Sequence, residues 1–381
     1  MKNYKTVIIG CGAAGCMCAL SIKSGKVAII DKATKPFKKI LVTGNGRCNL
    51  TNLNISSEKY NCNIDRYLDK FDVKQTLAFF EKLGLEWFAD DEGRVYPLSN
   101  QAKSVQDVVV NKLNEKADLY LGQSVVDIQC KDNIYIVTTE QESFCCDNVV
   151  VATGGNTMGE ILGKLKINTK QFTPSLVALK CNNLKDLNGV RIDNVKVTLS
   201  SNGTTKSEIG EVLFKDQGVS GIAVFNMSTL LARCGNYTGK ISIDLMPNVK
   251  HHQLIEKLKT RSKLDVNLDK MFVGMFNNAL SNEIFRQAKT NTNKLSTKLT
   301  SQEIETLANV IKNLTFNISG CYDNNQVFSG GVGLDQLTDS LMSKQYQGLY
   351  FVGEVCDVDG ECGGYNLQWA WTSGHIVGDI L

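Results

Sequence analysis

The chain has 381 residues, 43% of them apolar and 21% charged, and its 42 basic and 39 acidic side chains give a formal net charge of +3. The apolar share excludes a wholly disordered chain. The length predicts two or three structural units around a large buried core. The near balance of charge, without a long basic run, argues against a nucleic-acid partner.

The 13 cysteines are expected to be free thiols. Their number is odd, the chain is not short, and no two cysteines have the C-x-x-C spacing. A disulfide framework, a structural zinc site and a thioredoxin-type dithiol therefore lose their usual sequence support, and no metal site is predicted. Free thiols are typical of a reducing compartment, so we expect a cytoplasmic protein.

The N-terminal segment predicts a strand, a tight turn, a helix and a second strand. Residues 6–9 are short and β-branched, residues 10–15 read Gly-Cys-Gly-Ala-Ala-Gly, and residues 27–30 form another apolar run. The glycines interrupt what would otherwise resemble a signal peptide. No uninterrupted apolar run reaches the roughly 18 residues of a membrane span. The pattern indicates the βαβ opening of a dinucleotide-binding domain.

The residue types in this opening suit a dinucleotide. Gly10 permits the tight turn, Gly12 lets the backbone approach a pyrophosphate, and Gly15 lets the helix lie close to the strand. The N–H groups at the helix start would bind the phosphates. Asp31 ends the second strand, where it can accept hydrogen bonds from an adenosine ribose. The fingerprint does not separate FAD from NAD, because both contain adenosine and a pyrophosphate.

Three later segments are candidates for contact with an extended cofactor. The polar loop 35–52 either wraps such a cofactor or is an ordinary surface loop. Residues 149–155 form a strand that ends in small residues, where a sheet edge can approach a ligand closely. Residues 348–354 form another strand, and a glycine-rich turn then leads to a closing helix with Asn366 as its expected cap. That helix start suits the negative charge of a reduced flavin, although a plain closing helix has the same pattern.

The chain is predicted to form an α/β fold in which one domain is interrupted by an insert. Residues 184–250 are rich in strand-like segments, and residues 251–318 look helical. Strands followed by helices, after a βαβ opening, fit a separate module better than one continuous sheet. The predicted parts are therefore residues 1–183, the insert 184–318, and residues 319–381, which return to the style of the first part.

Four segments together resemble one bacterial flavoprotein family. They are TGNGRCNLTN (43–52), VATGG (151–155), GEVLFKDQGVSG (210–221) and GLYFVGEVCDVDGECGGYNLQWAWTSG (348–374). The chain is similar throughout to the BaiN-type bile-acid reductases, a family also described as aminoacetone-oxidase-like and NAD(P)/FAD-dependent. The resemblance implies a Rossmann-like two-dinucleotide-binding FAD domain, split by an insert with a β-barrel part and a helical part. We expect FAD to be bound non-covalently.

The predicted cofactor-binding residues combine the fingerprint with positions that the resemblance implies. They are Gly10, Gly12, Ala14, Gly15, Asp31, Lys32, Gly46, Arg47, Cys48, Asn49, Leu50, Val126, Thr153, Gly154, Glu354, Gly364, Tyr365, Asn366 and Leu367. Arg47 and Tyr365 are also the candidate catalytic residues. Arg47 is expected to stabilise an anion, and Tyr365 to orient the substrate or transfer a proton. Both side chains are expected to converge near the isoalloxazine, beneath an insert that covers the ring.

The chain departs from the family pattern just before the turn 218–221. Lys215 and Asp216 stand where the family usually has Thr-His. Any family role of that histidine, including proton donation, cannot be carried over. The three histidines of the chain are expected to be structural: His251, His252 and His375. Cys356 and Cys362 flank the glycine-rich turn, and we interpret them as buried thiols rather than as a redox pair.

The predicted function is that of an FAD-dependent oxidoreductase, with hydride passing through flavin N5 to or from a small organic molecule. The resemblance favours reduction of an activated C=C bond over dehydrogenation. Only one glycine-rich fingerprint is present, so either NAD(P)H binds transiently as the electron donor or another donor serves. The alternative is a non-catalytic FAD-binding redox sensor, or an RNA- or protein-binding flavoprotein. The expected partner is a small molecule, with no nucleic acid and no membrane, and the oligomeric state is left open.

Overall fold

The computed structural model describes residues 1–155, 158–182 and 184–381. They form two compact units: the split unit, Met1–Thr173 with Gln326–Leu381, and the insert, Pro174–Asn325. The insert therefore begins before the expected residue 184 and ends after the expected residue 318. Both boundaries move outward because β11 (Leu179–Cys181) and β16 (Leu314–Cys321) pair with each other inside the insert.

The split unit is built on one mixed sheet with the strand order β6-β2-β1-β9-β8-β7, and β18 also pairs with β9. The strands are β1 (Lys2–Ile9), β2 (Val27–Asp31), β6 (Asp118–Leu121), β7 (Val125–Lys131), β8 (Ile134–Thr139), β9 (Ser143–Val151) and β18 (Leu349–Phe351). β8 pairs antiparallel with both β7 and β9, and the other strand pairs of the sheet are parallel. Ile9 lies opposite both Ile30 and Val151, and Val151 lies opposite Phe351. The carboxyl ends of four parallel strands therefore meet at one edge, where open α/β sheets bind ligands.

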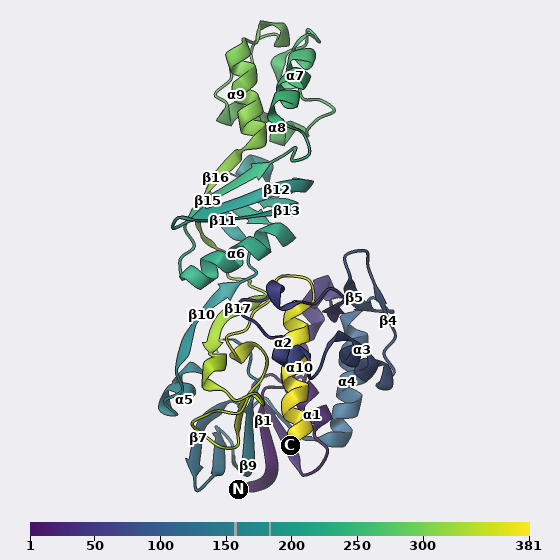
Figure 1. The fold of residues 1–381 in the computed structure, drawn as a ribbon, viewed down its shortest axis with the longest axis vertical. Coiled ribbons are helices and arrows are strands. Elements are labelled where there is room, and N and C mark those ends of the chain that lie inside the picture. The colour runs from purple at the N-terminus through teal and green to yellow at the C-terminus, as the bar shows by residue number, and fades with distance from the viewer. Residues whose placement is uncertain (156–157, 183) are drawn as a thin grey trace. The chain divides into compact units, whose positions relative to one another are not determined.

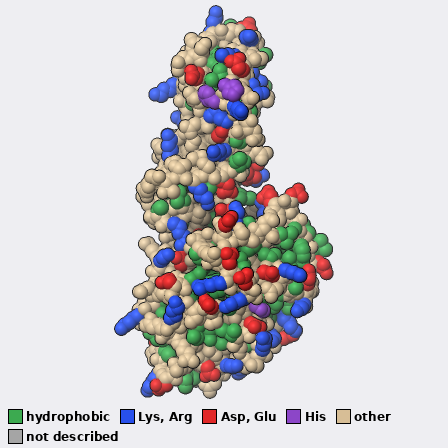
Figure 2. All heavy atoms as spheres, in the orientation of Figure 1, with side chains coloured by type: hydrophobic (Ala, Val, Ile, Leu, Met, Phe, Trp, Pro, Cys, Tyr) green, Lys and Arg blue, Asp and Glu red, His purple; other side chains and the backbone are tan. Residues whose placement is uncertain are grey.

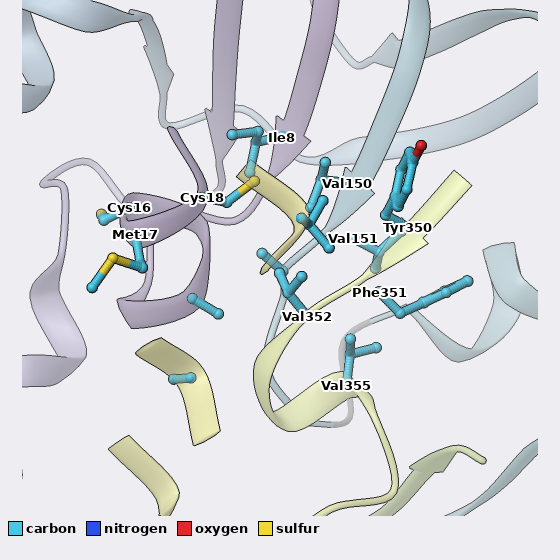
Figure 3. Packing of buried hydrophobic residues seen from close by; sticks show 14 of the residues in the cluster. Ile8, Cys16, Met17, Cys18, Val150, Val151, Tyr350, Phe351, Val352 and Val355 are labelled. Atoms are coloured by element: carbon cyan, nitrogen blue, oxygen red, sulfur yellow. The ribbon is translucent and has the colours of Figure 1, made fainter. Parts of the chain in front are cut away.

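The central strands are apolar because both faces of the sheet are covered. Ile8, Val150 and Phe351 have no exposed surface and pack into one core, with side chains from neighbouring strands and a helix (Figure 3). Buried parallel strands read as continuous apolar runs for this reason. This explains why the strands at 6–9 and 149–151 could be recognised from their sequence.

Two helices from opposite ends of the chain pack side by side in the split unit. They are α1 (Ala13–Ser21) and α10 (Tyr365–Ile380), and α10 is the yellow helix of Figure 1. A Cβ atom on Gly374 would lie 2.4 Å from the carbonyl oxygen of Ala14, and one on Gly378 would lie 2.4 Å from that of Cys18. The two glycines thus let the helix backbones approach each other more closely than any side chain would permit.

Shorter elements surround this framework. Those wholly or mainly in the split unit are η1 (Lys38–Gly46), β3 (Thr51–Asn52), η2 (Ser57–Lys59), α2 (Asp65–Leu68), α3 (Val73–Lys82), β4 (Trp87–Ala89), β5 (Arg94–Pro97), α4 (Ala102–Lys116), α5 (Gly159–Lys164), β10 (Thr169–Ser175), β17 (Val327–Val332), η6 (Leu334–Gln336) and η7 (Gly353–Val355). β3, β4 and β5 form a small antiparallel sheet, and β10 pairs with β17.

The insert contains a closed barrel with the strand order β11-β14-β13-β12-β15-β16. Its other elements are η3 (Lys185–Leu187), β12 (Arg191–Ser201), β13 (Thr204–Lys215), β14 (Gly218–Ser220), α6 (Ile222–Cys234), β15 (Gly239–Asp244), α7 (His251–Ser262), η4 (Leu268–Lys270), α8 (Asn278–Gln287), η5 (Ser296–Lys298) and α9 (Ser301–Lys312). The expectation of strands followed only by helices was wrong in one respect. α7, α8 and α9 precede β16, so the strand that closes the barrel comes after the helical part.

Candidate functional site

The glycines of the fingerprint serve different purposes in the folded chain. A Cβ atom on Gly10, whose φ is +109°, would lie 2.4 Å from the carbonyl oxygen of Ala152, and one on Gly15 would lie 2.0 Å from that of Gly10. Packing within the protein therefore requires glycine at both positions. A Cβ atom on Gly12 would meet nothing within 4 Å. The open space at Gly12 is what close approach of a dinucleotide pyrophosphate requires, so the fingerprint fits such a cofactor.

The start of α1 supplies hydrogen-bond donors beside this space. Gly12 is the N-cap, and the first backbone hydrogen bond of the helix runs from Cys16 N to Gly12 O, at 2.9 Å. Within the described ranges no hydrogen bond engages the amides of Ala13 and Ala14. Free N–H groups and the positive end of the helix dipole together favour a phosphate at this point.

Asp31 is held at the end of β2 by two backbone amides. Its Oδ2 accepts from Cys11 N at 2.6 Å, and its Oδ1 accepts from Ala33 N at 2.7 Å. A carboxylate has about four acceptor positions, so some remain for the hydroxyl groups of a ribose. Gln123 N also donates to Asp31 O at 3.0 Å, which brings the loop after β6 to this point. That loop leads into β7, on which Val126 is 42% exposed. Lys32 is exposed.

The loop 43–52 is exposed at Asn45 and Gly46 and buried toward its end. Gly44 and Asn45 both have left-handed backbone conformations, with φ of 56°. The side chain of Cys48 is fully buried, and burial raises the pKa of its thiol to about 12. Leu50 is also fully buried, and its amide donates to Val95 O at 2.7 Å while its carbonyl accepts from Trp371 Nε1 at 2.8 Å. Leu50 therefore exposes no surface to a ligand, and its amide and carbonyl are both engaged within the protein.

This loop is joined to the start of α10 by residues that are distant in sequence. The side-chain oxygen of Asn49 accepts from Gly364 N at 3.2 Å, and its nitrogen donates to Thr51 O at 3.0 Å. Thr51 Oγ1 donates to Gln368 Oε1 at 2.6 Å, and Gln368 Nε2 donates to the hydroxyl of Thr76 at 2.9 Å. All of these contacts lie within the split unit, and they fix the loop against the helix end.

The helix α10 begins at Tyr365, and its cap is Gly364 rather than the expected Asn366. Gly363 and Gly364 have φ of +124° and +102°, conformations that favour glycine. Asn366 instead bonds back to the turn, accepting from Gly360 N and donating to Gly360 O, each at 2.9 Å. The prediction overlooked the tandem left-handed glycines, which set the chain direction at this point. Asn366 therefore fixes the turn that precedes the helix.

The start of α10 is a second cluster of free donors. Gln368 N donates to Gly364 O at 2.9 Å, and in the described part of the chain no hydrogen bond engages the amides of Tyr365, Asn366 and Leu367. These amides and the positive helix end would stabilise negative charge on a ligand.

Glu354 connects three segments around the predicted cofactor. Its Oε1 accepts from Phe328 N at 2.7 Å, and its Oε2 forms an ion pair with Lys39 Nζ at 2.9 Å. A Cβ atom on Gly154 would lie 3.3 Å from the same Oε2, so Gly154 and the adjacent Thr153 lie beside this carboxylate. The sequence analysis missed Lys39, whose only signal was its place in a polar loop.

The two candidate catalytic side chains are each held by a tyrosine that the sequence analysis also missed. The Arg47 guanidinium lies 4.4 Å from the centre of the Tyr96 ring, and its Nη2 is 3.4 Å from the Tyr96 hydroxyl. Tyr365 is 7% exposed and packs edge-to-face on Tyr60 at 5.9 Å, while the Tyr60 hydroxyl donates to Tyr365 O at 2.7 Å. No contact joins Arg47 to Tyr365 among the described residues. Their convergence near the isoalloxazine stays a prediction.

Burial raises the pKa of Tyr365 above its usual 10.0. The phenol therefore remains protonated at neutral pH and can donate a proton or a hydrogen bond. The guanidinium of Arg47 is a cation with several N–H donors, which suits it to stabilise an anion. The two side chains thus have the chemistry that each proposed role requires.

A family model for the HI0933-like protein Rossmann domain matches residues 4–380. The chain belongs to the HI0933-like family. It is 31% identical over 405 residues to the 3-dehydro-bile acid delta(4,6)-reductase of Clostridium scindens, and the match covers 97% of each protein. The ribosomal RNA dihydrouridine synthase of Escherichia coli is 27% identical over 404 residues, which cover 98% of this chain and 96% of that protein.

A solved structure shows a similar fold. It is the 3-ketosteroid delta1-dehydrogenase from Sterolibacterium denitrificans, with a TM-score of 0.51 and 12% identity, covering 100% of this chain and 99% of that one. These findings confirm the expected family and the Rossmann-type FAD-binding fold with an inserted barrel. The HI0933-like chain is accordingly an enzyme of the FAD-dependent oxidoreductase class. The assignment of individual residues to FAD remains a prediction.

Two cysteines and two histidines of this HI0933-like protein can now be compared with their expected surroundings. Cys356 is buried, and burial raises the pKa of its thiol, whereas Cys362 is partly exposed with its Sγ 3.9 Å from Gln326 Oε1. The expectation that Cys362 is buried was therefore wrong. His375 stacks on Phe71 at 3.9 Å, and His251 Nε2 lies 2.7 Å from Asn309 Oδ1.

The described residues form neither a metal-binding cluster nor a membrane-spanning helix. Among them, no three histidine, cysteine, aspartate or glutamate side chains gather in a way that could hold a metal ion. No described helix is both long enough and apolar enough to cross a bilayer.

Proposed function

We propose that this HI0933-like flavoprotein reduces a C=C bond that is conjugated to a carbonyl group. The observation that carries the proposal is the similarity along the whole chain to two differently named relatives. One name describes reduction of double bonds in a 3-keto steroid, and the other describes formation of dihydrouridine, in which the C5=C6 bond of uracil is saturated. Both double bonds are conjugated to a carbonyl, so one chemistry accounts for both relatives.

The residues of the site suit this reaction. When bound, FAD supplies a hydride to one carbon of the double bond. The amides of Gly12, Ala13 and Ala14 would hold its pyrophosphate, and Asp31 its adenosine ribose. The free amides at the start of α10, including that of Tyr365, would stabilise negative charge on the flavin ring.

The second half of the reaction requires charge stabilisation and a proton. Hydride addition leaves an enolate, with negative charge on the carbonyl oxygen of the substrate. Arg47 would stabilise that charge, and the Tyr365 hydroxyl would protonate the other carbon of the double bond. The double bond then gains one hydride and one proton in total. The Tyr60 and Tyr96 contacts would orient these two side chains for those roles.

The electron donor is proposed to be NAD(P)H, which binds for one hydride transfer and then leaves. A single glycine-rich fingerprint, already assigned to FAD, supports transient binding over a dedicated second domain. Mixing the oxidised holoprotein with NADH or NADPH under anaerobic conditions tests this proposal. Bleaching of the flavin absorbance with either nucleotide is expected. Lack of bleaching with both would assign the reduction to another donor.

The proposal is tested by reoxidation of the reduced holoprotein without dioxygen. The protein is photoreduced and mixed with a steroid 4,6-dien-3-one, with other enones, or with a uridine-containing ribosomal RNA transcript. The matched controls are the saturated ketone and a transcript in which dihydrouridine replaces uridine. Return of the oxidised flavin spectrum with a conjugated compound, but not with its saturated control, is expected. Failure of every conjugated acceptor would favour the alternative of a redox sensor without catalytic activity.

A further inference from the structure

One outer face of the barrel carries polar side chains on neighbouring strands. β12 lies between β13 and β15, as Figure 1 shows. The side chains that alternate outward are Lys196, Thr198 and Ser200 on β12 and Lys240, Ser242 and Asp244 on β15, while the residues between them are buried apolar groups such as Val197 and Ile241. The strand registers place Thr198 opposite Ser242 and Ser200 opposite Lys240. Lys196 lies opposite Asp244, so the face combines hydroxyl groups with two lysines at opposite ends of the paired stretch of β12 and β15.

This face is hollowed. A cavity of about 340 Å³ is lined by these six residues together with Lys312 and Asn313 at the end of α9. Hydroxyl pairs extend the face onto β13, since Thr198 lies 2.8 Å from the Ser207 hydroxyl and Ser200 lies 3.1 Å from that of Thr205. All of these side chains can donate hydrogen bonds except Asp244.

The charges of the hollow do not cancel. Lys312 Nζ pairs with Asp244 at 2.6 Å and also donates to the carbonyls of Met246 and Val249, each at 2.9 Å, so this pair is locked in place. In the part of the chain that the structure describes, neither Lys196 nor Lys240 forms an ion pair. The hollow thus keeps two free cations beside a set of hydroxyl donors. Elsewhere basic and acidic side chains are interspersed over the visible faces of both units (Figure 2).

Nearby carboxylates on β13 do not compensate these cations. Glu208 accepts from Asn226 Nδ2 at 2.8 Å, and Glu211 pairs with Arg191 at 3.0 Å. Outward polar residues of a barrel are usually just solvated, and for most of this surface that explanation is sufficient. It does not account for a concave site with an excess of positive charge and donors, which is the chemistry that phosphate groups require.

The length of the face favours a chain of phosphates over a single one. Lys240 lies opposite Ser200, four residues along β12 from Lys196. At about 3.3 Å per residue, the two lysine positions are about 13 Å apart along the strand. One free phosphate cannot sit between both in direct contact with the strand hydroxyls, whereas successive phosphates of an extended strand can meet each lysine in turn.

We infer that this barrel face binds the phosphodiester backbone of RNA. The inference deepens the proposed function by favouring RNA as the carrier of the reducible uracil, and to that extent it rests on it. It assigns the insert a role in RNA binding, in which Lys196 and Lys240 contact the phosphate backbone. It also departs from the expectation that nucleic acid is not a partner, because that expectation used the net charge of the whole chain rather than its distribution.

The test measures RNA binding by the FAD-loaded protein across a range of salt concentrations. The probe is a fluorescein-labelled ribosomal RNA hairpin that contains uridine, followed by fluorescence anisotropy. The variant is Lys196→Gln/Lys240→Gln. Its matched control is Lys74→Gln/Lys82→Gln on α3, where two exposed lysines without ion pairs among the described residues lose the same charge. Flavin content and the melting temperature are measured for both variants, to show that each is folded.

The expected result is a loss of affinity that is similar for hairpins of different sequence. The slope of log K against log [salt] should become shallower by about 2, or about 1 for each lysine. The control pair should leave both quantities unchanged. Equal losses in the two variants would overturn the inference, because they would reflect general attraction only. Competition by millimolar inorganic phosphate as strong as that by RNA would also overturn it, in favour of a single-anion site.

Failure of this inference can be distinguished from failure of the proposed function. If a free enone reoxidises the reduced flavin but the wild-type protein binds no RNA, the reductase chemistry stands and only the barrel assignment is wrong. If RNA binds through Lys196 and Lys240 but no conjugated compound reoxidises the flavin, the barrel assignment stands and the reductase proposal is wrong.

Discussion

At the residue scale, the fingerprint separates glycines needed for folding from one needed for a ligand. Gly10 and Gly15 have no room for a side chain because of neighbouring backbone atoms, whereas Gly12 faces open space. A substitution at Gly12 therefore reports on the cofactor alone, which gives the predicted FAD site its sharpest test.

Gly12→Val should abolish FAD binding and leave the fold intact. The valine methyl groups would occupy the space that the pyrophosphate needs, while the protein offers no atom within 4 Å for a Cβ to strike. Loss of a glycine N-cap should cost only on the order of 1 kcal/mol. Flavin released by acid is measured per chain, with circular dichroism as the check on folding. Gly163→Val on α5, another open position, is the control and should keep its FAD. Normal flavin content in Gly12→Val would place the phosphate site elsewhere.

Tyr365→Phe should slow turnover while FAD stays bound. Removal of a general acid typically costs roughly 100-fold or more in rate. Burial raises the pKa of Tyr365 above 10.0, so wild-type turnover should persist on the alkaline side of the usual tyrosine pKa. Steady-state rates with an enone between pH 6 and pH 11 check both points. Tyr135→Phe is the matched control, since it loses a structural hydrogen bond to Gln347 O but no group proposed to act in the reaction. Unchanged turnover in Tyr365→Phe would make this residue a packing residue.

His375 should make the protein less stable in mild acid. Its pKa is lowered from 6.5, mainly because burial disfavours the charged ring; Asp379 opposes that shift and Lys23 adds to it. Below pH 6.5 the unfolded chain binds a proton that the folded chain does not. The free energy of unfolding therefore decreases as the pH is lowered through this window. Urea unfolding at pH 7.5 and pH 5.5 should show a smaller loss for His375→Gln than for the wild type. The control His252→Gln, at an exposed position, should behave as the wild type does. An identical loss in all three proteins would contradict the prediction.

At the scale of elements, the site depends on the N-termini of α1 and α10. The close packing of these two helices fixes the position of one N-terminus relative to the other. The crossing is close because Gly374 and Gly378 face carbonyl oxygens of α1. The start of α1 is placed at the carboxyl edge of the sheet, and the start of α10 is tied to the loop 43–52 through Asn49. Loosening the crossing should therefore disturb stability and flavin binding together.

Gly374→Ala should destabilise the protein although alanine is the better helix former. The new Cβ would lie 2.4 Å from Ala14 O, and such overpacking typically costs about 1–3 kcal/mol. The same change at Gly163, where nothing lies within 4 Å, should be neutral or stabilising by up to about 1 kcal/mol. Urea unfolding of the two variants compares them directly. Equal stabilities would show that the helices can separate without cost.

The sequence indicated those elements whose signal is local. The βαβ opening could be predicted because its strands are continuous apolar runs and its glycines have a fixed spacing. The contacts of Asn49 with Gly364, and of Thr51 with Gln368, could not, because each joins segments more than 300 residues apart. β16 was missed for another reason: it follows α9 almost directly, and its alternating pattern at 314–321 was read as the end of the helical part. Tyr60 and Tyr96 belong to no motif. Their relevance follows only from their contacts with Tyr365 and Arg47 in the folded chain.

At the scale of the whole molecule, the two units have different proposed roles. The split unit contains the Rossmann-type sheet, the starts of α1 and α10 and the side chains expected to contact FAD. The insert contains the barrel face with Lys196 and Lys240. The family assignment rests on a match to residues 4–380, so it covers both units. The central claim is that this enzyme saturates a C=C bond conjugated to a carbonyl group.

The most direct test of that claim is the mass of the product in a single turnover. The holoprotein is reduced with one equivalent of dithionite and mixed anaerobically with a steroid 4,6-dien-3-one or, in parallel, with a uridine-containing ribosomal RNA transcript. The account predicts a gain of two mass units in at least one substrate, with one double bond saturated for each FAD oxidised. A flavin that is reoxidised by a quinone or by dioxygen while neither substrate gains mass would contradict it.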